Sequence, residues 1–162
     1  MSATQPRVEV ETESSEARQK IVDAARSMLG VPFVHQGRSP RGVDCVGLLV
    51  LVARQLGMRY RDNTTYGRCP NPRQLTDALS ASCVKVAEVD AQHASEEVWK
   101  SAQPGDVVAF WTARAGWPQH VAIRTERGIL HTWANVRRVV EHGMTDHWRE
   151  RVHSVWRYQP HS

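Results

Sequence analysis

The residue with the clearest chemical potential is Cys45, which stands at the start of an apolar run that predicts a buried helix. Asp44 is a suitable N-cap, because its carboxylate accepts hydrogen bonds from the amides of a first helical turn. Gly57 is a stop signal for this helix. At such a position the helix dipole favours thiolate over thiol, and Gly47 should leave the sulfur open to approach. A core cysteine is the plainer interpretation, but it fits the middle of a helix better than its start.

Two of the histidines occupy places that suit a general base. His120 begins a β-type segment after a loop, and His131 lies on the next such segment. If Glu126 and Arg127 form a two-residue turn, His120 and His131 become diagonal neighbours on one face. A three-residue turn would separate them, and Asn135, which shares the strand parity of His131, is the rival orienting residue. The alternative interpretation of His120 is an ordinary surface histidine.

Together these residues supply what amide hydrolysis needs: a nucleophile, a proton shuttle and a stabiliser for the oxyanion. The Cys45 thiolate would attack the carbonyl, protonated His120 would deliver a proton to the leaving amine, and His131 would hold the imidazole tautomer. The backbone N–H of Cys45 is the expected first oxyanion donor, and Gln36 is the expected second.

Arginines and further histidines close to these positions have other possible roles. Arg38 and Arg41, in the loop before the nucleophile, suit a peptide carboxylate as ligand, or they are solvated loop arginines. His142, His147 and His153 form neither an HExxH pattern nor tight zinc-ligand spacing. The sequence therefore predicts no metal site, and it predicts no cofactor.

The pattern around these residues predicts helices first and strands later. Residues 15–29 keep helical spacing up to Gly30, and Asn71 with Gln74 forms a helix-start signature. Short helical turns are expected at residues 95–97 and 145–146. The β-type segments are residues 84–89, 106–111, 120–125, 129–134, 137–141 and 153–158. This order indicates an α+β domain at residues 15–160 with an antiparallel sheet, preceded by a flexible tail at residues 1–14.

Composition narrows the classes of function. The 162 residues suffice for one domain with a proper core. The net charge of +4 comes mostly from arginines that are scattered, which disfavours nucleic acid as a partner. No apolar run is long enough for membrane insertion, and the polar N-terminus has no signal-peptide pattern. Three cysteines without CxxC spacing indicate reduced thiols.

Five short motifs, in order and in register, resemble the NlpC-type cell-wall cysteine peptidases. They are the segments 30–33, 44–48, 105–110, 120–123 and 129–131. The resemblance covers residues 16–158 and implies a papain-like fold, with the nucleophile helix packed on the antiparallel sheet. It implies cleavage of peptidoglycan stem peptides, commonly between D-glutamate and a diamino acid. Cys45 matches the nucleophile of the family, His120 the base and His131 the orienting residue.

This chain departs from the family pattern at the site. Phe33 stands where many members have a tyrosine, and Val46 stands where a serine is frequent. His35 and Gln36 replace an aromatic residue and a glycine, and either could supply the missing polar group. An amidase or acyltransferase of the same fold, and a structural protein with a vestigial site, are therefore the alternatives to an endopeptidase.

Residues 33–38 resemble a narrower set, the single-domain peptidases encoded among the tail genes of phages and gene transfer agents. This likeness implies other tail-tip proteins as partners. It further implies a protein made in the cytoplasm without a signal peptide, which reaches the cell wall on a virion tail or through cell lysis.

Overall fold

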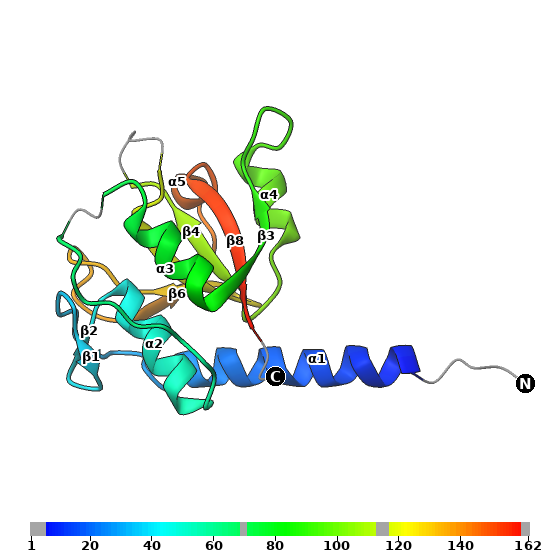
Figure 1. Cartoon of the computed structure of the whole chain (residues 1–162), viewed down its shortest axis with the longest axis horizontal. Helices are drawn as coiled ribbons and strands as arrows, with labels where there is room; N and C mark the ends of the chain where they lie inside the picture. Colours follow the sequence, from blue (N-terminus) through cyan, green and yellow to red (C-terminus); the bar gives the residue numbers. More distant parts are fainter. Residues whose placement is uncertain (1–5, 69–70, 113–116, 160–162) are drawn as a thin grey trace, which may run out of the picture.

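A computed structural model describes residues 6–68, 71–112 and 117–159, with side chains from residue 14 onward. The fold is α+β, as the sequence predicted, with helices and an antiparallel sheet (Figure 1). Its helices are α1 (Pro6–Arg26), α2 (Cys45–Gln55), α3 (Gln74–Ser82), α4 (Ser95–Ser101) and α5 (Asp146–Arg149). Its strands are β1 (Arg38–Ser39), β2 (Gly42–Val43), β3 (Cys83–Glu88), β4 (Val107–Phe110), β5 (His120–Thr125), β6 (Gly128–His131), β7 (Val140–His142) and β8 (Val152–Tyr158).

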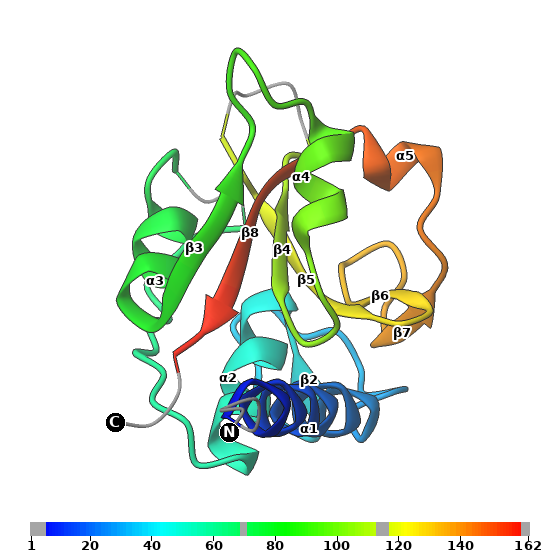
Figure 2. The same ribbon diagram turned by 90° about the vertical axis from the view of Figure 1, so that its right-hand side faces the viewer.

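The main sheet has six strands in the order β3-β8-β4-β5-β6-β7, and neighbouring strands run antiparallel. Its central strands β4, β5 and β6 are buried almost throughout, because helices cover both faces of the sheet. Val107 and Ala109 of β4 pack towards α1 and α2, whereas Val108 and Phe110 pack towards α4 and α5. Figure 2 shows α4 lying over β4 and β8.

Helix α2, which begins at Cys45, is the centre of the larger core. Eight consecutive residues of α2, from Val46 to Ala53, are buried between α1 and the sheet. Such burial on all sides explains why the segment is apolar all round rather than amphipathic. The start of α2 is thereby held rigidly against β5, the strand that carries His120.

The largest difference from the sequence-based expectation lies at the N-terminus. α1 begins at Pro6 rather than near Ser15, so most of the segment that the sequence predicted to be a flexible tail is helical. Proline suits the first turn of a helix, because its fixed φ is already helical and its missing N–H would have no partner there. The first turns of α1 project beyond the rest of the domain (Figure 1). The helix ends at Arg26, and Gly30 follows with a φ of +84°.

The remaining elements follow the predicted order with small shifts. Asn71 and Gln74 form the expected reciprocal cap, because Asn71 Oδ1 accepts from the Gln74 amide and Gln74 Oε1 accepts from the Asn71 amide. The strand expected at residues 137–141 is shorter and later, at Val140–His142.

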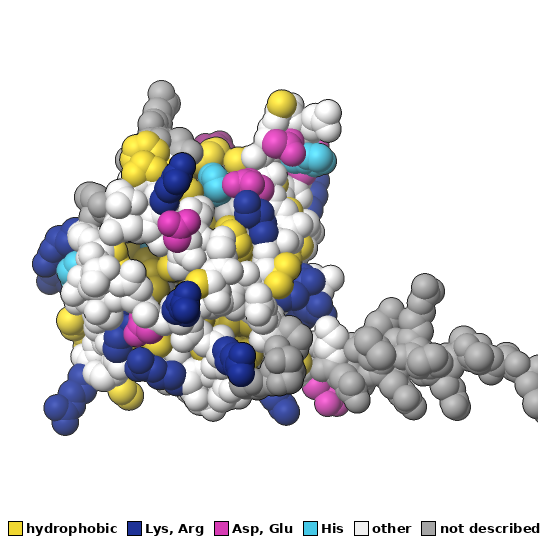
Figure 3. Space-filling model, in the orientation of Figure 1, with side chains coloured by type: hydrophobic (Ala, Val, Ile, Leu, Met, Phe, Trp, Pro, Cys, Tyr) yellow, Lys and Arg dark blue, Asp and Glu magenta, His cyan; other side chains and the backbone are white. Residues whose placement is uncertain are grey.

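No helix in the described part of the chain is long and apolar enough to cross a membrane. Basic side chains lie scattered over the face in Figure 3.

Candidate active site

Cys45 is the first residue of α2 and lies at the floor of a pocket, where it is partly exposed. Asp44 is the N-cap that the sequence predicted, since its Oδ1 accepts a hydrogen bond of 2.8 Å from the Gly47 amide. Gly47, however, is buried and does not open the site. A Cβ there would collide with the Gly37 carbonyl oxygen, so this glycine allows the preceding loop to pack directly on the helix.

The two predicted histidines meet on one face of the sheet. Thr125 pairs with Gly128, so Glu126 and Arg127 form a two-residue turn as expected. His120 Nε2 lies 2.7 Å from His131 Nδ1, and both side chains are buried. Asn135, the alternative candidate for the residue that orients His120, lies in the turn after β6 and lines the pocket. The hydrogen bond to the His120 ring is therefore made by His131.

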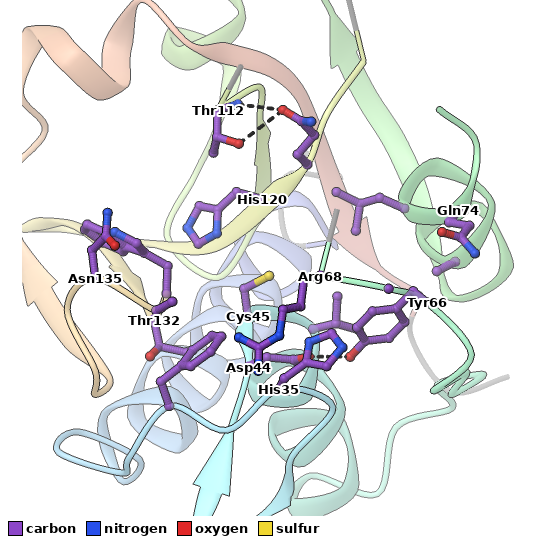
Figure 4. Close-up of a pocket in the computed structure, with 18 of the residues that line it drawn as sticks. His35, Asp44, Cys45, Tyr66, Arg68, Gln74, Thr112, His120, Thr132 and Asn135 are labelled. Atoms are coloured by element: carbon purple, nitrogen blue, oxygen red, sulfur yellow. Dashed lines mark hydrogen bonds between the residues drawn. The ribbon is translucent and has the colours of Figure 1, made fainter. Parts of the chain in front are cut away.

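Cys45 and His120 line the same pocket, and in Figure 4 the Cys45 side chain extends into the part of the site above which the His120 ring lies. Because His120 Nε2 is bonded to His131, Nδ1 is the ring nitrogen left to serve the sulfur. The Val121 amide also faces the thiol and lowers its pKa, which places the sulfur beside the first residues of β5. Cys45, His120 and His131 thus come from three elements, α2, β5 and β6.

The pocket around Cys45 and His120 has a volume of about 760 Å³. Its walls combine aromatic side chains, among them Trp133 and Trp148, with basic side chains from two connecting segments. The basic residues are Arg61, Arg68 and Arg151. Such a cavity suits a ligand with apolar portions and at least one anionic group.

The NlpC/P60 family model matches residues 30–157, which is most of the chain and includes every residue of the site described above. The chain belongs to the NlpC/P60 family. This membership agrees with the order of motifs around Cys45, His120 and His131, and the papain-like fold of the family is the fold observed. No curated protein matches the chain.

Solved structures of NlpC/P60 proteins share the fold at low sequence identity. An NlpC/P60 family protein from Bacillus cereus has 22% identity and a TM-score of 0.59, over 88% of this chain and 40% of that one. A Staphylococcus aureus protein similar to a lipoprotein of the family has 22% identity and a TM-score of 0.61, over 90% and 42%. NlpC2 from Trichomonas vaginalis has 20% identity and a TM-score of 0.62, over 87% and 46%. The chain therefore spans less than half the length of these relatives.

Several residues that the sequence predicted to contact substrate instead bind other residues of this NlpC/P60 domain or lie outside the pocket. Gln36 does not line the pocket, because its amide donates to the Tyr66 carbonyl oxygen at 2.7 Å, so the expected second oxyanion donor is not in place. Arg38 is held by Asp44 and Asp62 and is not free to take a substrate carboxylate. Arg41 is exposed and away from the pocket. Of the four loop residues, only His35 lines the cavity.

Tyr66 is a site residue that the sequence pattern did not reveal. Its hydroxyl donates to Asp44 Oδ2 at 2.6 Å and accepts from the Arg38 guanidinium at 2.7 Å. Tyr66 lines the pocket, so it brings a hydroxyl to the neighbourhood of Cys45 that Phe33 cannot provide. The segment from 58 to 68 is irregular, and no local pattern in it indicates which side chain points inward.

The ionisation state of the site differs from the sequence-based expectation. Burial, reinforced by the charge of Asp44, raises the pKa of the Cys45 thiol to about 12. Burial lowers the pKa of His120 to about 3, and burial together with the neighbouring imidazoles lowers the pKa of His131 to about 2. The helix dipole contributes only about 0.3–1 kcal/mol, which is less than desolvation of a buried charge costs. The resting pair is therefore neutral thiol and neutral imidazole.

This neutral state predicts how Cys45 reacts with iodoacetamide. The alkylation rate should rise about tenfold for each pH unit between 7 and 10, because only the thiolate reacts and its fraction grows with pH below the pKa. Cys83, a free thiol that is only 3% exposed, should stay protected. Peptide mapping after timed labelling measures both rates. A rate at Cys45 that is constant from pH 6 to 9 would instead indicate a thiolate–imidazolium pair.

The buried histidines also predict loss of stability in acid. Their pKa values lie below the unfolded value of 6.5, so the unfolded state binds more protons once the pH falls below about 6.5. Between pH 7 and pH 5 the free energy of unfolding should fall by about 2 kcal/mol for each of the two. Urea titrations at both pH values measure this loss.

Two variants serve as tests of that loss. His131→Asn removes one buried imidazole and should reduce the fall in stability. His93→Asn should not reduce it, because His93 is exposed and its hydrogen bond to Asp90 raises its pKa. A fall that is equal in wild type and in the His131→Asn variant would show that other groups cause the acid sensitivity.

Proposed function

We propose that this chain is a cysteine peptidase that hydrolyses an amide bond in peptidoglycan stem peptides. The observation that carries the proposal is that Cys45 and His120 line the same pocket, while His131 Nδ1 lies 2.7 Å from Nε2 of the His120 imidazole. Membership of the NlpC/P60 family supports it, because members of this family are cysteine peptidases and peptidoglycan hydrolases.

The first half of the reaction is acyl transfer to the enzyme. His120 Nδ1 accepts the thiol proton as the Cys45 sulfur attacks the substrate carbonyl. This transfer is needed because both groups are neutral in the resting state. The backbone N–H of Cys45, at the start of α2, is the expected donor to the developing oxyanion. The C–N bond then breaks, and the imidazolium returns its proton to the leaving amine, so that a thioester remains on Cys45.

The second half is hydrolysis of the thioester. His120 takes a proton from a water molecule, whose oxygen attacks the thioester carbonyl, and then protonates the departing sulfur. The products are a carboxylic acid and the free thiol. His131 stabilises His120 in the required orientation throughout, as the orienting residue does in other nucleophile–histidine sites.

The finer proposal is cleavage between D-glutamate and a diamino acid. In a stem peptide this bond has a free carboxylate beside it, and the arginines of the pocket supply a complementary charge. Arg68 lines the same pocket as Cys45 and His35, and it is the arginine that we expect to bind this carboxylate. The resemblance of residues 33–38 to tail-associated peptidases supports delivery of the protein on a virion tail. Mass spectrometry of purified particles tests that role, and the protein should be found in them.

Mass analysis of purified muropeptides incubated with the protein tests the activity. The expected products are a peptide ending in D-glutamate and a fragment with a new amine on the diamino acid. Release of the whole stem peptide from the sugar would favour an amidase, and joined peptides would favour an acyltransferase. Unchanged muropeptides would favour a structural protein with a vestigial site and contradict the proposal.

A further inference from the structure

A third histidine extends the hydrogen-bonded pair in the active site. His131 Nε2 lies 2.8 Å from His142 Nε2, and His142 Nδ1 lies 2.8 Å from the Gly143 carbonyl oxygen. A carbonyl oxygen can only accept a hydrogen bond, so His142 Nδ1 must carry a proton. In a neutral imidazole the other nitrogen, Nε2, is then an acceptor.

This single constraint decides the proton positions along the whole chain of rings. His142 Nε2 accepts, so His131 Nε2 must donate to it, which leaves His131 Nδ1 as an acceptor. His120 Nε2 must then donate to His131 Nδ1. The free lone pair of His120 is consequently on Nδ1, the nitrogen that serves the Cys45 sulfur. A reversed chain would place a proton on Nδ1 and leave the thiol without a base.

The sheet makes this arrangement possible by its register. His120, His131 and His142 lie on the three neighbouring strands β5, β6 and β7, at positions that are eleven apart in the sequence. Ile129 pairs with His142 and His131 pairs with Val140, so His142 is displaced by two residues from the position opposite His131. It faces the same side of the sheet, one diagonal step further from the nucleophile.

We propose that His142 is a positioning residue, which fixes the tautomers of His131 and His120 through the Gly143 carbonyl so that His120 Nδ1 is a base. His142 does not line the pocket and touches no reacting atom, so it acts through His131 alone. The proposal rests on the proposed function for its effect on turnover, but the proton positions themselves do not depend on any substrate.

The first experiment therefore needs no substrate. ¹⁵N NMR of histidine-labelled wild-type protein at pH 7.5 reports which ring nitrogen carries the proton. The expected result is protonation of Nε2 in His120 and His131 and of Nδ1 in His142. A wild-type His120 with its proton on Nδ1 would overturn the proposal, whatever the protein does to muropeptides.

The second experiment compares two variants that differ in one acceptor. His142→Gln keeps an oxygen that can accept from His131, and His142→Phe keeps the ring volume without an acceptor. With muropeptides, His142→Phe should lower kcat at least about 10-fold with KM nearly unchanged, and His142→Gln should stay within about 3-fold of wild type. Equal loss in both variants, or a wild-type kcat in His142→Phe, would overturn the positioning role. Inactive wild-type protein would instead count against the proposed function, and the NMR result would still decide the inference.

Discussion

Replacement of His120 by alanine should lower kcat for muropeptide hydrolysis by about 1,000- to 10,000-fold, the range expected when a general base is lost. The thiol would then have to ionise without help, and its pKa is raised to about 12 by burial. KM should change little, because proton transfer by His120 matters in the transition state and contributes little to substrate binding. Steady-state kinetics by chromatography of the products measures both constants.

Two comparisons show whether this loss is specific. His93→Ala removes an exposed histidine far from the pocket and should leave kcat as in wild type. Thermal unfolding of the His120→Ala protein establishes that the domain is still folded, since this imidazole packs against Trp148 at a ring distance of 5.3 Å. A folded His120→Ala protein with more than about a tenth of wild-type kcat would contradict the role of His120.

Replacement of Asp44 by alanine should lower the free energy of unfolding by about 3–5 kcal/mol, the cost of breaking a buried charge pair by removing one partner. Asp44 is 4% exposed and accepts hydrogen bonds from the Gly47 and Gln36 amides, the Arg38 guanidinium and the Tyr66 hydroxyl. The alanine variant loses all four contacts, including the N-cap of α2. Urea unfolding at pH 7 measures the change.

Asp77→Ala is the matched control, because Asp77 also lies in the first turn of a helix but is exposed on α3. Its effect should stay below about 1 kcal/mol. Asp44→Asn separates charge from hydrogen bonding. Because the charge of Asp44 raises the pKa of Cys45, this variant should alkylate faster than wild type at the same pH. A loss below 1 kcal/mol in Asp44→Ala would contradict the account of the network.

Local sequence patterns were sufficient to predict where Cys45 and His120 lie in their elements. The cap at Asp44 and the stop at Gly57 delimit α2, and both act within a few residues of the chain. The turn at Glu126 and Arg127 has only two residues, so it determines which side chains of β5 and β6 share a face. The contact between His120 and His131 follows from that register alone.

Contacts between distant segments were not predictable in the same way. Gln36 and Arg38 look free in the sequence, but they are engaged by Tyr66 and Asp62, which belong to an irregular segment more than twenty residues later. The ionisation of Cys45 depends on how deeply the fold buries it, which a helix-start pattern does not report. Gly47 appeared to uncover the site, whereas it is a packing position for the preceding loop.

The spacing of His120, His131 and His142 did contain a signal that zinc-ligand patterns do not capture. A sequence separation of eleven between successive histidines matches two hairpins of similar length, which carry the three rings across neighbouring strands. The strand around His142 was predicted too early, at residues 137–141, so its parity relative to His131 was not available from the sequence. An exact strand position was needed before the third histidine could be placed.

The central claim is that Cys45 is the nucleophile of a peptidoglycan peptidase. Parallel digestion of the same purified muropeptides by wild-type protein, Cys45→Ala and Cys83→Ala, followed by mass spectrometry, tests it most directly. Cys83 is a buried thiol outside the pocket, so its alanine variant controls for loss of a cysteine. If Cys45 is the nucleophile, wild type and Cys83→Ala cleave the muropeptides and Cys45→Ala does not. Cleavage that persists in Cys45→Ala would contradict it.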